Sequence, residues 1–79
     1  MRQHFVYFFK KGLSEVKVSE SKEVRDKLIE LISPERKSTY YAIANRGWRD
    51  IPVHMYRAIT ALFGEYGVSE DRVWEVKTI

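Results

Sequence analysis

The sequence predicts a single domain of the α+β class, with an N-terminal β-hairpin, three central helices and a short C-terminal strand. Three observations lead to this prediction. An aromatic and β-branched run opens the chain, apolar residues at helical spacing occupy its middle, and an alternating run closes it. Because the chain has 79 residues and no long linker, it has room for one hydrophobic core only. We expect the hairpin in residues 1–19, the helices in residues 21–66, and a turn followed by a strand in residues 68–79.

The hairpin is predicted from residues 5–9, which have the composition of a strand, and from residues 16–18, in which apolar and polar residues alternate. Gly12 interrupts the pattern, so the turn is expected near residues 10–13. Both faces of the first strand are apolar, so both should be covered. We expect helices to cover one face, and a second copy of the chain is a candidate to cover the other. One face carries Phe5, Tyr7 and Phe9, and the other carries Val6 and Phe8.

Two of the three helices are predicted from apolar residues that recur at i, i+4, i+7 and i+8. The first is expected over residues 22–32, with Ser21 as its N-cap. The third is expected to begin with Pro52 in its first turn and to end near Gly64 and Gly67. The apolar positions are Val24, Leu28, Leu31 and Ile32 in the first, and Met55, Tyr56, Ile59, Leu62 and Phe63 in the third.

The middle helix is predicted from its two ends. Ser33-Pro34-Glu35 is a typical start, because Ser suits the N-cap, Pro the first helical position and Glu the positive end of the helix dipole. Gly47 is the usual residue just past a helix that ends at Arg46. Tyr40 and Tyr41 are adjacent and cannot both face the core, so we expect one of them at the surface and take Tyr40 as the better core candidate.

The last twelve residues are predicted as one short helical turn and a strand. Ser69-Glu70-Asp71 is a helix start. Residues 75–79 are predicted as a strand that pairs with the N-terminal strands, in preference to a continued helix.

The basic residues concentrate in the centre of the chain. The net charge is +3, with 14 basic and 11 acidic side chains. The segment from Arg36 to Arg57 contains five basic residues and one acidic residue, which leaves 9 basic and 10 acidic residues elsewhere. The central segment therefore carries +4 and the remainder −1. A single basic patch is typical of a protein that binds a polyanion, while the alternative is an ordinary solvated face.

No residue pattern typical of an enzyme is present in the sequence. The chain has no cysteine and two histidines, so a thiol nucleophile and a closed zinc site are excluded. Asp50 and His54 are four residues apart, but no serine is placed to complete a triad. There is no glycine-rich phosphate loop. We therefore expect no catalytic residues, no metal and no cofactor.

The longest apolar run at the N-terminus has five residues, which is shorter than a signal-peptide core or a membrane span. The expected location is the cytoplasm, with no membrane partner.

The first two helices and their short link predict a helix-turn-helix arrangement. The fold class is thus α+β, with the N-terminal β-hairpin followed by a three-helix helix-turn-helix unit and a short C-terminal strand. Over residues 22–74 the chain resembles the DNA-binding domains of phage repressors of the lambda-repressor or Cro type. In this sequence a four-residue link, Ser33-Pro34-Glu35-Arg36, stands where that family has a tight glycine turn. The resemblance is carried by Ser38-Thr39-Tyr40-Tyr41, Asn45-Arg46-Gly47, Ile51-Pro52, Ile59-Thr60-Ala61-Leu62-Phe63, Gly67-Val68-Ser69 and Val73-Trp74.

The resemblance implies a regulator of transcription that binds double-stranded DNA by occupancy, usually as a homodimer on a two-fold site. Ser38, Thr39 and Tyr41 would contact base edges or phosphates. Other residues would contact the backbone or the wall of the groove. These are Arg36, Lys37, Asn45, Arg46, Trp48 and Arg49.

Two alternatives use the aromatic hairpin instead. In the first, Phe5, Tyr7 and Phe9 form a surface for a partner protein or a second copy, as in a small inhibitor module. In the second, the same three rings stack on the bases of single-stranded RNA.

Overall fold

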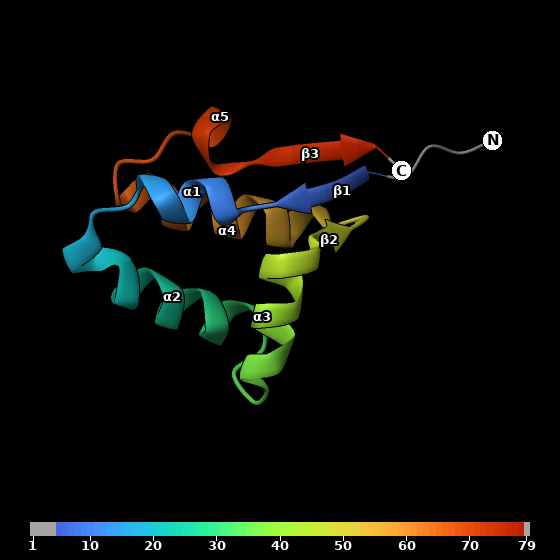
Figure 1. The fold of residues 1–79 in the computed structure, drawn as a ribbon, viewed down its shortest axis with the longest axis horizontal. Coiled ribbons are helices and arrows are strands. Elements are labelled where there is room, and N and C mark those ends of the chain that lie inside the picture. Colours follow the sequence, from blue (N-terminus) through green and yellow to red (C-terminus); the bar gives the residue numbers. More distant parts are fainter. Residues whose placement is uncertain (1–4, 79) are drawn as a thin grey trace.

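The computed structural model describes residues 5–78, which form an α+β fold with a three-stranded antiparallel sheet (Figure 1). The predicted fold class is confirmed. The sheet order is β2-β1-β3, so the N-terminal strand is the central one. Among the described residues, no helix has the length and apolar character needed to cross a membrane. The elements are β1 (Phe5–Phe8), α1 (Lys10–Glu15), α2 (Val18–Ile32), α3 (Lys37–Arg46), β2 (Trp48–Arg49), α4 (Val53–Glu65), α5 (Glu70–Val73) and β3 (Glu75–Thr78).

The predicted N-terminal hairpin is wrong. The chain after β1 forms the helix α1, and the partners of β1 are the distant strands β2 and β3. Gly12, interpreted as a turn residue, lies in α1, where an added Cβ would come within 3.0 Å of the Val73 Cα atom and 3.1 Å of the Phe63 ring. The glycine therefore allows α1 to approach α4 and α5 closely. Val16 belongs to the core instead of a second strand.

Two predicted helix starts are also corrected. α2 begins at Val18 instead of Lys22, and the hydroxyl of Ser21 donates a hydrogen bond to the Val18 carbonyl (2.9 Å) from inside the helix instead of capping it. α3 begins at Lys37, so Ser33 to Arg36 form a turn between the helices. Pro34 is compatible with both interpretations, because its φ near −65° suits the first position of a helix and the second position of a turn equally well.

Other boundaries are confirmed. α3 ends at Arg46, with Gly47 at φ 83° directly after it. α4 begins at Val53, within one residue of the predicted start, although Pro52 is the N-cap and does not lie in the first turn. The short helical turn and the C-terminal strand are present as α5 and β3. Of the predicted strand, Ile79 lies outside the described residues.

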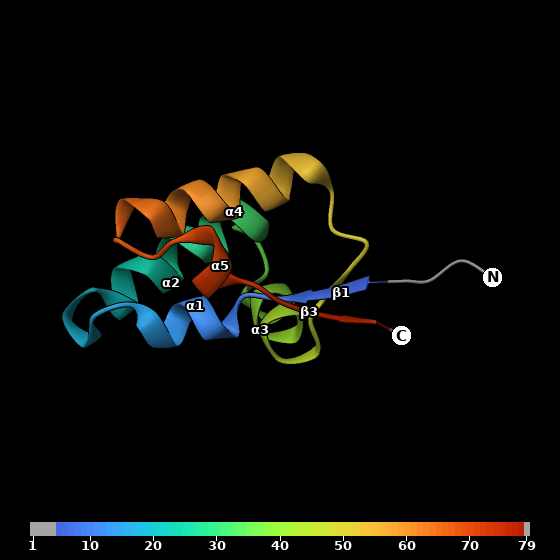
Figure 2. The same cartoon turned by 90° about the horizontal axis from the view of Figure 1, so that it is seen from above.

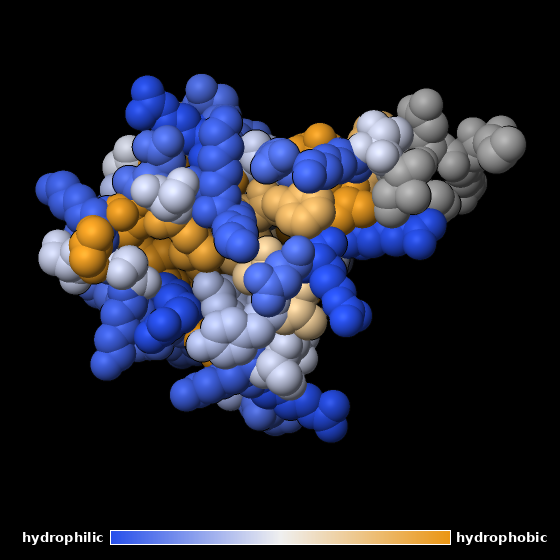
Figure 3. Space-filling model, in the orientation of Figure 1, coloured by the Kyte–Doolittle hydropathy of each residue, from blue (hydrophilic) through white to orange (hydrophobic). Residues whose placement is uncertain are grey.

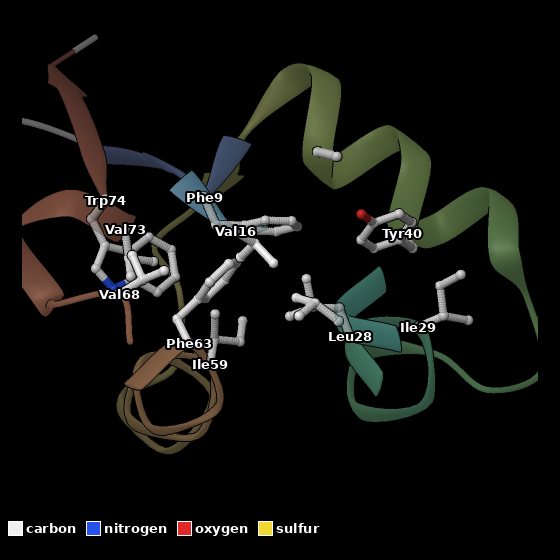
Figure 4. Close-up of a cluster of buried hydrophobic side chains, with 12 residues drawn as sticks. Phe9, Val16, Leu28, Ile29, Tyr40, Ile59, Phe63, Val68, Val73 and Trp74 are labelled. Carbon is white, nitrogen blue, oxygen red and sulfur yellow. The ribbon is translucent and has the colours of Figure 1, made fainter. Parts of the chain in front are cut away.

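The helices surround a core to which almost every element contributes (Figure 4). Phe9 is fully buried; its ring stacks on Tyr40 of α3 at 5.9 Å between centroids and meets Trp74 edge-on at 6.4 Å. Phe63 and Ile59 of α4 and Leu28 of α2 are also fully buried. One phenylalanine thus joins α3 to the C-terminal segment, which positions α3 relative to the sheet.

Helices of the same chain cover both faces of β1. On one face, Tyr7 meets Tyr56 of α4 edge-on at 5.9 Å, and Figure 2 shows α4 along one side of the molecule. On the other face, Val6 and Phe8 lie so close to Gly47 that a Cβ atom there would collide with both. A second copy is therefore not needed to cover this strand.

Candidate nucleic-acid interface

α2 and α3 form a helix pair joined by a short turn, as the sequence predicts. They run in clearly different directions (Figure 1). α3 is anchored by Tyr40 and Ala44, whose exposed fractions are 3% and 8%, and α2 contributes the buried residues Leu28 and Ile29. Since Tyr40 and Ala44 are four residues apart, they fix one stripe of α3 against the core, and the opposite side faces solvent.

The solvent side of α3 carries no acidic residue, and none occurs anywhere between Arg36 and Arg49. Figure 3 shows hydrophilic side chains around this helix, at the bottom of the view. The exposed residues of α3 are Lys37, Ser38, Tyr41, Ala42, Asn45 and Arg46, while Thr39 and Ile43 are half-buried. Five of the six predicted contact residues on α3 are therefore exposed, and Thr39 is the half-buried one.

The two tyrosines separate as expected. Tyr40 faces the core, and Tyr41 is 47% exposed with its ring edge-on to Tyr40 at 5.1 Å. Burial raises the pKa of Tyr40 above its ordinary value, an effect that the charge of Arg25 opposes. Tyr40 therefore acts as an anchor in the core, whereas Tyr41 is exposed and its ring contacts that of Tyr40.

The two ends of α3 differ in electrostatic environment. At the start, Lys37 lines a shallow depression together with Asp26 and Glu30 of α2. At the other end, Arg46 and Arg49 are both exposed. The positive character of the surface is therefore greater towards the end of α3.

The remaining predicted residues flank this surface. Arg36 is exposed in the turn before α3. Trp48 is half-buried and packs against the core, which limits its role in any contact. Arg49 is paired with Val6 in the sheet register and therefore lies on the face of the sheet that meets the end of α3. Ala42 is not among the predicted contacts, because its side chain has no polar atom, but it is exposed and lies between Ser38 and Asn45 along the helix.

The aromatic surface required by the alternative interpretations is not formed as predicted. Phe9 is fully buried, and Tyr7 is half-buried among Tyr56 and Trp74. Phe5 alone of the three is exposed, at 41%. The three rings therefore offer neither a common surface for a partner nor a platform for stacked bases.

Two depressions lie elsewhere. One, of about 550 Å³, lies between α2 and α4 and combines Leu31, Ala58 and Leu62 with charged residues of both signs. The other, of about 220 Å³, is lined by Tyr7, Ile51, Val53 and Tyr56. Neither gathers a set of reactive groups. In the described part of the chain, no group of three or more His, Asp or Glu residues could hold a metal ion.

A hydrogen-bonded chain holds the C-terminal segment to α4. Trp74 Nε1 donates to Thr60 Oγ1 (2.9 Å), and Thr60 Oγ1 donates to the Tyr56 carbonyl (2.7 Å). The Tyr56 hydroxyl donates to Glu70 Oε2 (2.5 Å), and this bond, with burial and the carboxylate charge, raises the pKa of Tyr56 to about 12. These groups bond to one another, so their role is to hold α4, α5 and β3 together.

No protein-family model, curated protein or solved structure matches this chain. Its function is therefore inferred from its own residues and their arrangement.

Proposed function

We propose that this protein binds double-stranded DNA, with α3 in the major groove, and regulates by occupying its site. The observation that carries the proposal is the exposed face of α3, which combines hydrogen-bonding side chains with cations and has no acidic residue. Ser, Asn, Tyr, Lys and Arg are the residue types that contact phosphates and base edges. A helix of this kind fits the major groove.

The arrangement of α3 supports this proposal further. Tyr40 and Ala44 anchor it along one stripe, so the opposite face can approach a ligand without loss of core contacts. The short turn from α2 and the large angle between the helices are features of a helix-turn-helix. Lys37, Arg46 and Arg49 would contact phosphates, and Ser38, Tyr41 and Asn45 would face the groove. Such a role requires a compartment that holds DNA, in keeping with the expected cytoplasmic location.

The test is a fluorescence-anisotropy titration with a mixed-sequence duplex of about 20 base pairs, roughly two helical turns. Each phosphate contact releases counterions, so the logarithm of the affinity should fall linearly with the logarithm of the salt concentration. Arg46→Ala should lower the affinity and reduce the slope by about 0.9, the value for one phosphate contact. Absence of duplex binding at ~50 mM salt, where non-specific DNA binders still associate, would refute the proposal.

Arg72→Ala is the matched control for Arg46→Ala. Both arginines are exposed in the last turn of a helix, but α5 lies at the top of Figure 1 and α3 at the bottom. The control should leave affinity and slope unchanged. Equal effects of the two substitutions would show that net charge, and not the surface of α3, governs binding.

We expect two copies to bind one two-fold site. A titration above the dissociation constant measures this stoichiometry directly, and saturation at one protein per duplex would contradict the expectation.

A further inference from the structure

Three residues occupy the centre of the exposed face of α3. With 3.6 residues per turn, Ser38, Ala42 and Asn45 lie within about 60° of one another around the helix axis. All three are exposed. Tyr41 lies on one flank of this group and Arg46 on the other. The residues that would point most directly at a base edge are thus a hydroxyl, a methyl group and an amide, and the cations lie to the side.

The two polar side chains of this central group are available to a ligand. Within the part of the chain that the structure describes, neither Ser38 nor Asn45 makes a side-chain hydrogen bond. By contrast, the hydroxyls of Ser14 and Ser21 donate to backbone carbonyls of their own helices. The Asn45 amide has two donors and one acceptor, and none of the described residues bonds to them.

The chemistry of this group matches one kind of base pair. An asparagine amide can bond to both N6 and N7 of adenine in the major groove, and an alanine methyl can pack on the C5 methyl of thymine. Guanine is most often read by arginine or lysine, and neither occupies the centre of the face. Ala42 and Asn45 are separated by about 4.5 Å along the helix, close to the rise of about 3.4 Å between base pairs.

We infer that α3 selects A·T base pairs, with the Asn45 amide bonded to an adenine and the Ala42 methyl packed on a thymine methyl of the same or the next base pair. This inference rests on the proposed function and adds to it the class of sequence that is recognised. Ser38 contributes less discrimination, because its hydroxyl can bond to either kind of pair.

The experiment compares four duplexes of about 20 base pairs in the same anisotropy assay. The first alternates adenine and thymine. In the second uracil replaces thymine, and in the third 7-deazaadenine replaces adenine. The fourth alternates guanine and cytosine. The second and third lack only the thymine methyl and the adenine N7 atom, both of which lie in the major groove. They therefore separate reading of base edges from effects of DNA shape.

We expect the 7-deazaadenine duplex to bind at least roughly fivefold more weakly than the parent, since a bidentate contact of this kind discriminates by that factor or more. The uracil duplex should bind about fourfold more weakly, as for one buried methyl group. Asn45→Ala should remove the difference between adenine and 7-deazaadenine. Arg46→Ala, the control, should weaken binding to all duplexes alike and preserve that difference.

The possible outcomes are distinguishable. Equal affinity for the parent, uracil and 7-deazaadenine duplexes would overturn the inference and leave DNA binding intact. Sensitivity to uracil alone would overturn the role of Asn45. Absence of binding to all four duplexes at ~50 mM salt would overturn the inference together with the proposed function.

Discussion

The two helices of the central pair use their exposed faces differently. α2 carries four acidic and three basic residues, and its Lys27 and Glu23 form an ion pair at 3.6 Å. α3 carries two basic residues and no acidic residue, and among the described residues its Ser38 and Asn45 make no side-chain hydrogen bond. The exposed face of α2 is therefore an ordinary solvated surface with balanced charge, whereas that of α3 is suited to an anionic partner. The three predictions below concern the contacts that hold α3 and the C-terminal segment in place, beginning with the largest effect.

The strongest test removes the anchor of α3. Tyr40→Ala should lower the free energy of unfolding by about 3 to 5 kcal/mol, as for other large aromatic residues in a core. Tyr41→Ala, on the exposed face, should lower it by less than about 1 kcal/mol. Chemical denaturation followed by circular dichroism measures both values. Similar losses from the two substitutions would contradict the division of α3 into a buried and an exposed side.

The second test concerns the end of α3. Gly47 has φ 83°, and a Cβ atom there would collide with Val6 and Phe8, so Gly47→Ala should cost about 2 to 4 kcal/mol through backbone strain and displacement of α3 from the sheet. Gly67 is the matched control, because its φ is 80° but nothing lies within 4 Å of its Cβ position. Gly67→Ala should cost only the strain, about 1 to 2 kcal/mol. Thermal unfolding measures both effects. Equal shifts of the midpoint temperature for the two substitutions would show that the contact of Gly47 with the sheet does not contribute to stability.

The third and smallest effect is expected in alkaline solution. Tyr56 donates to Glu70, and its folded-state pKa of about 12 lies above the ordinary value of 10.0. The folded protein therefore keeps this proton when the unfolded chain has lost it. The resulting stabilisation is complete below pH 10 and disappears as the pH rises towards 12.

Ultraviolet titration of the tyrosines detects this residue directly. Glu70→Ala should lower the pH at which one tyrosine loses its proton. Asp71→Ala, which removes the neighbouring carboxylate, should leave that pH unchanged. Identical titration curves for wild type and Glu70→Ala would show that the bond does not hold the proton.

Much of the candidate site follows from local sequence signals. Gly47 marks the end of α3, the adjacent tyrosines must point to different sides, and the basic residues cluster in the centre of the chain. Two details required the structure. The residue type of Trp48 is compatible with a contact to DNA or with packing in the protein, and the structure shows that Trp48 packs against the core. Ala42 has no polar atom in its side chain, so only its position between Ser38 and Asn45 indicates a role.

The sequence by itself determined the α+β class, the strand composition of β1, the C-terminal strand and the end of α3, because these depend on periodicity and on the backbone preferences of neighbouring residues. The tertiary structure decided the partners of β1, the helical state of residues 10–15 and the start of α3. Strand pairing joins residues such as Tyr7 and Val76, which are far apart in the chain, and no local pattern specifies such a pair. Gly12 shows the reason most simply. Its missing side chain is compatible with a turn or with a close helix contact, and the packing of Phe63 and Val73 against it selects the second.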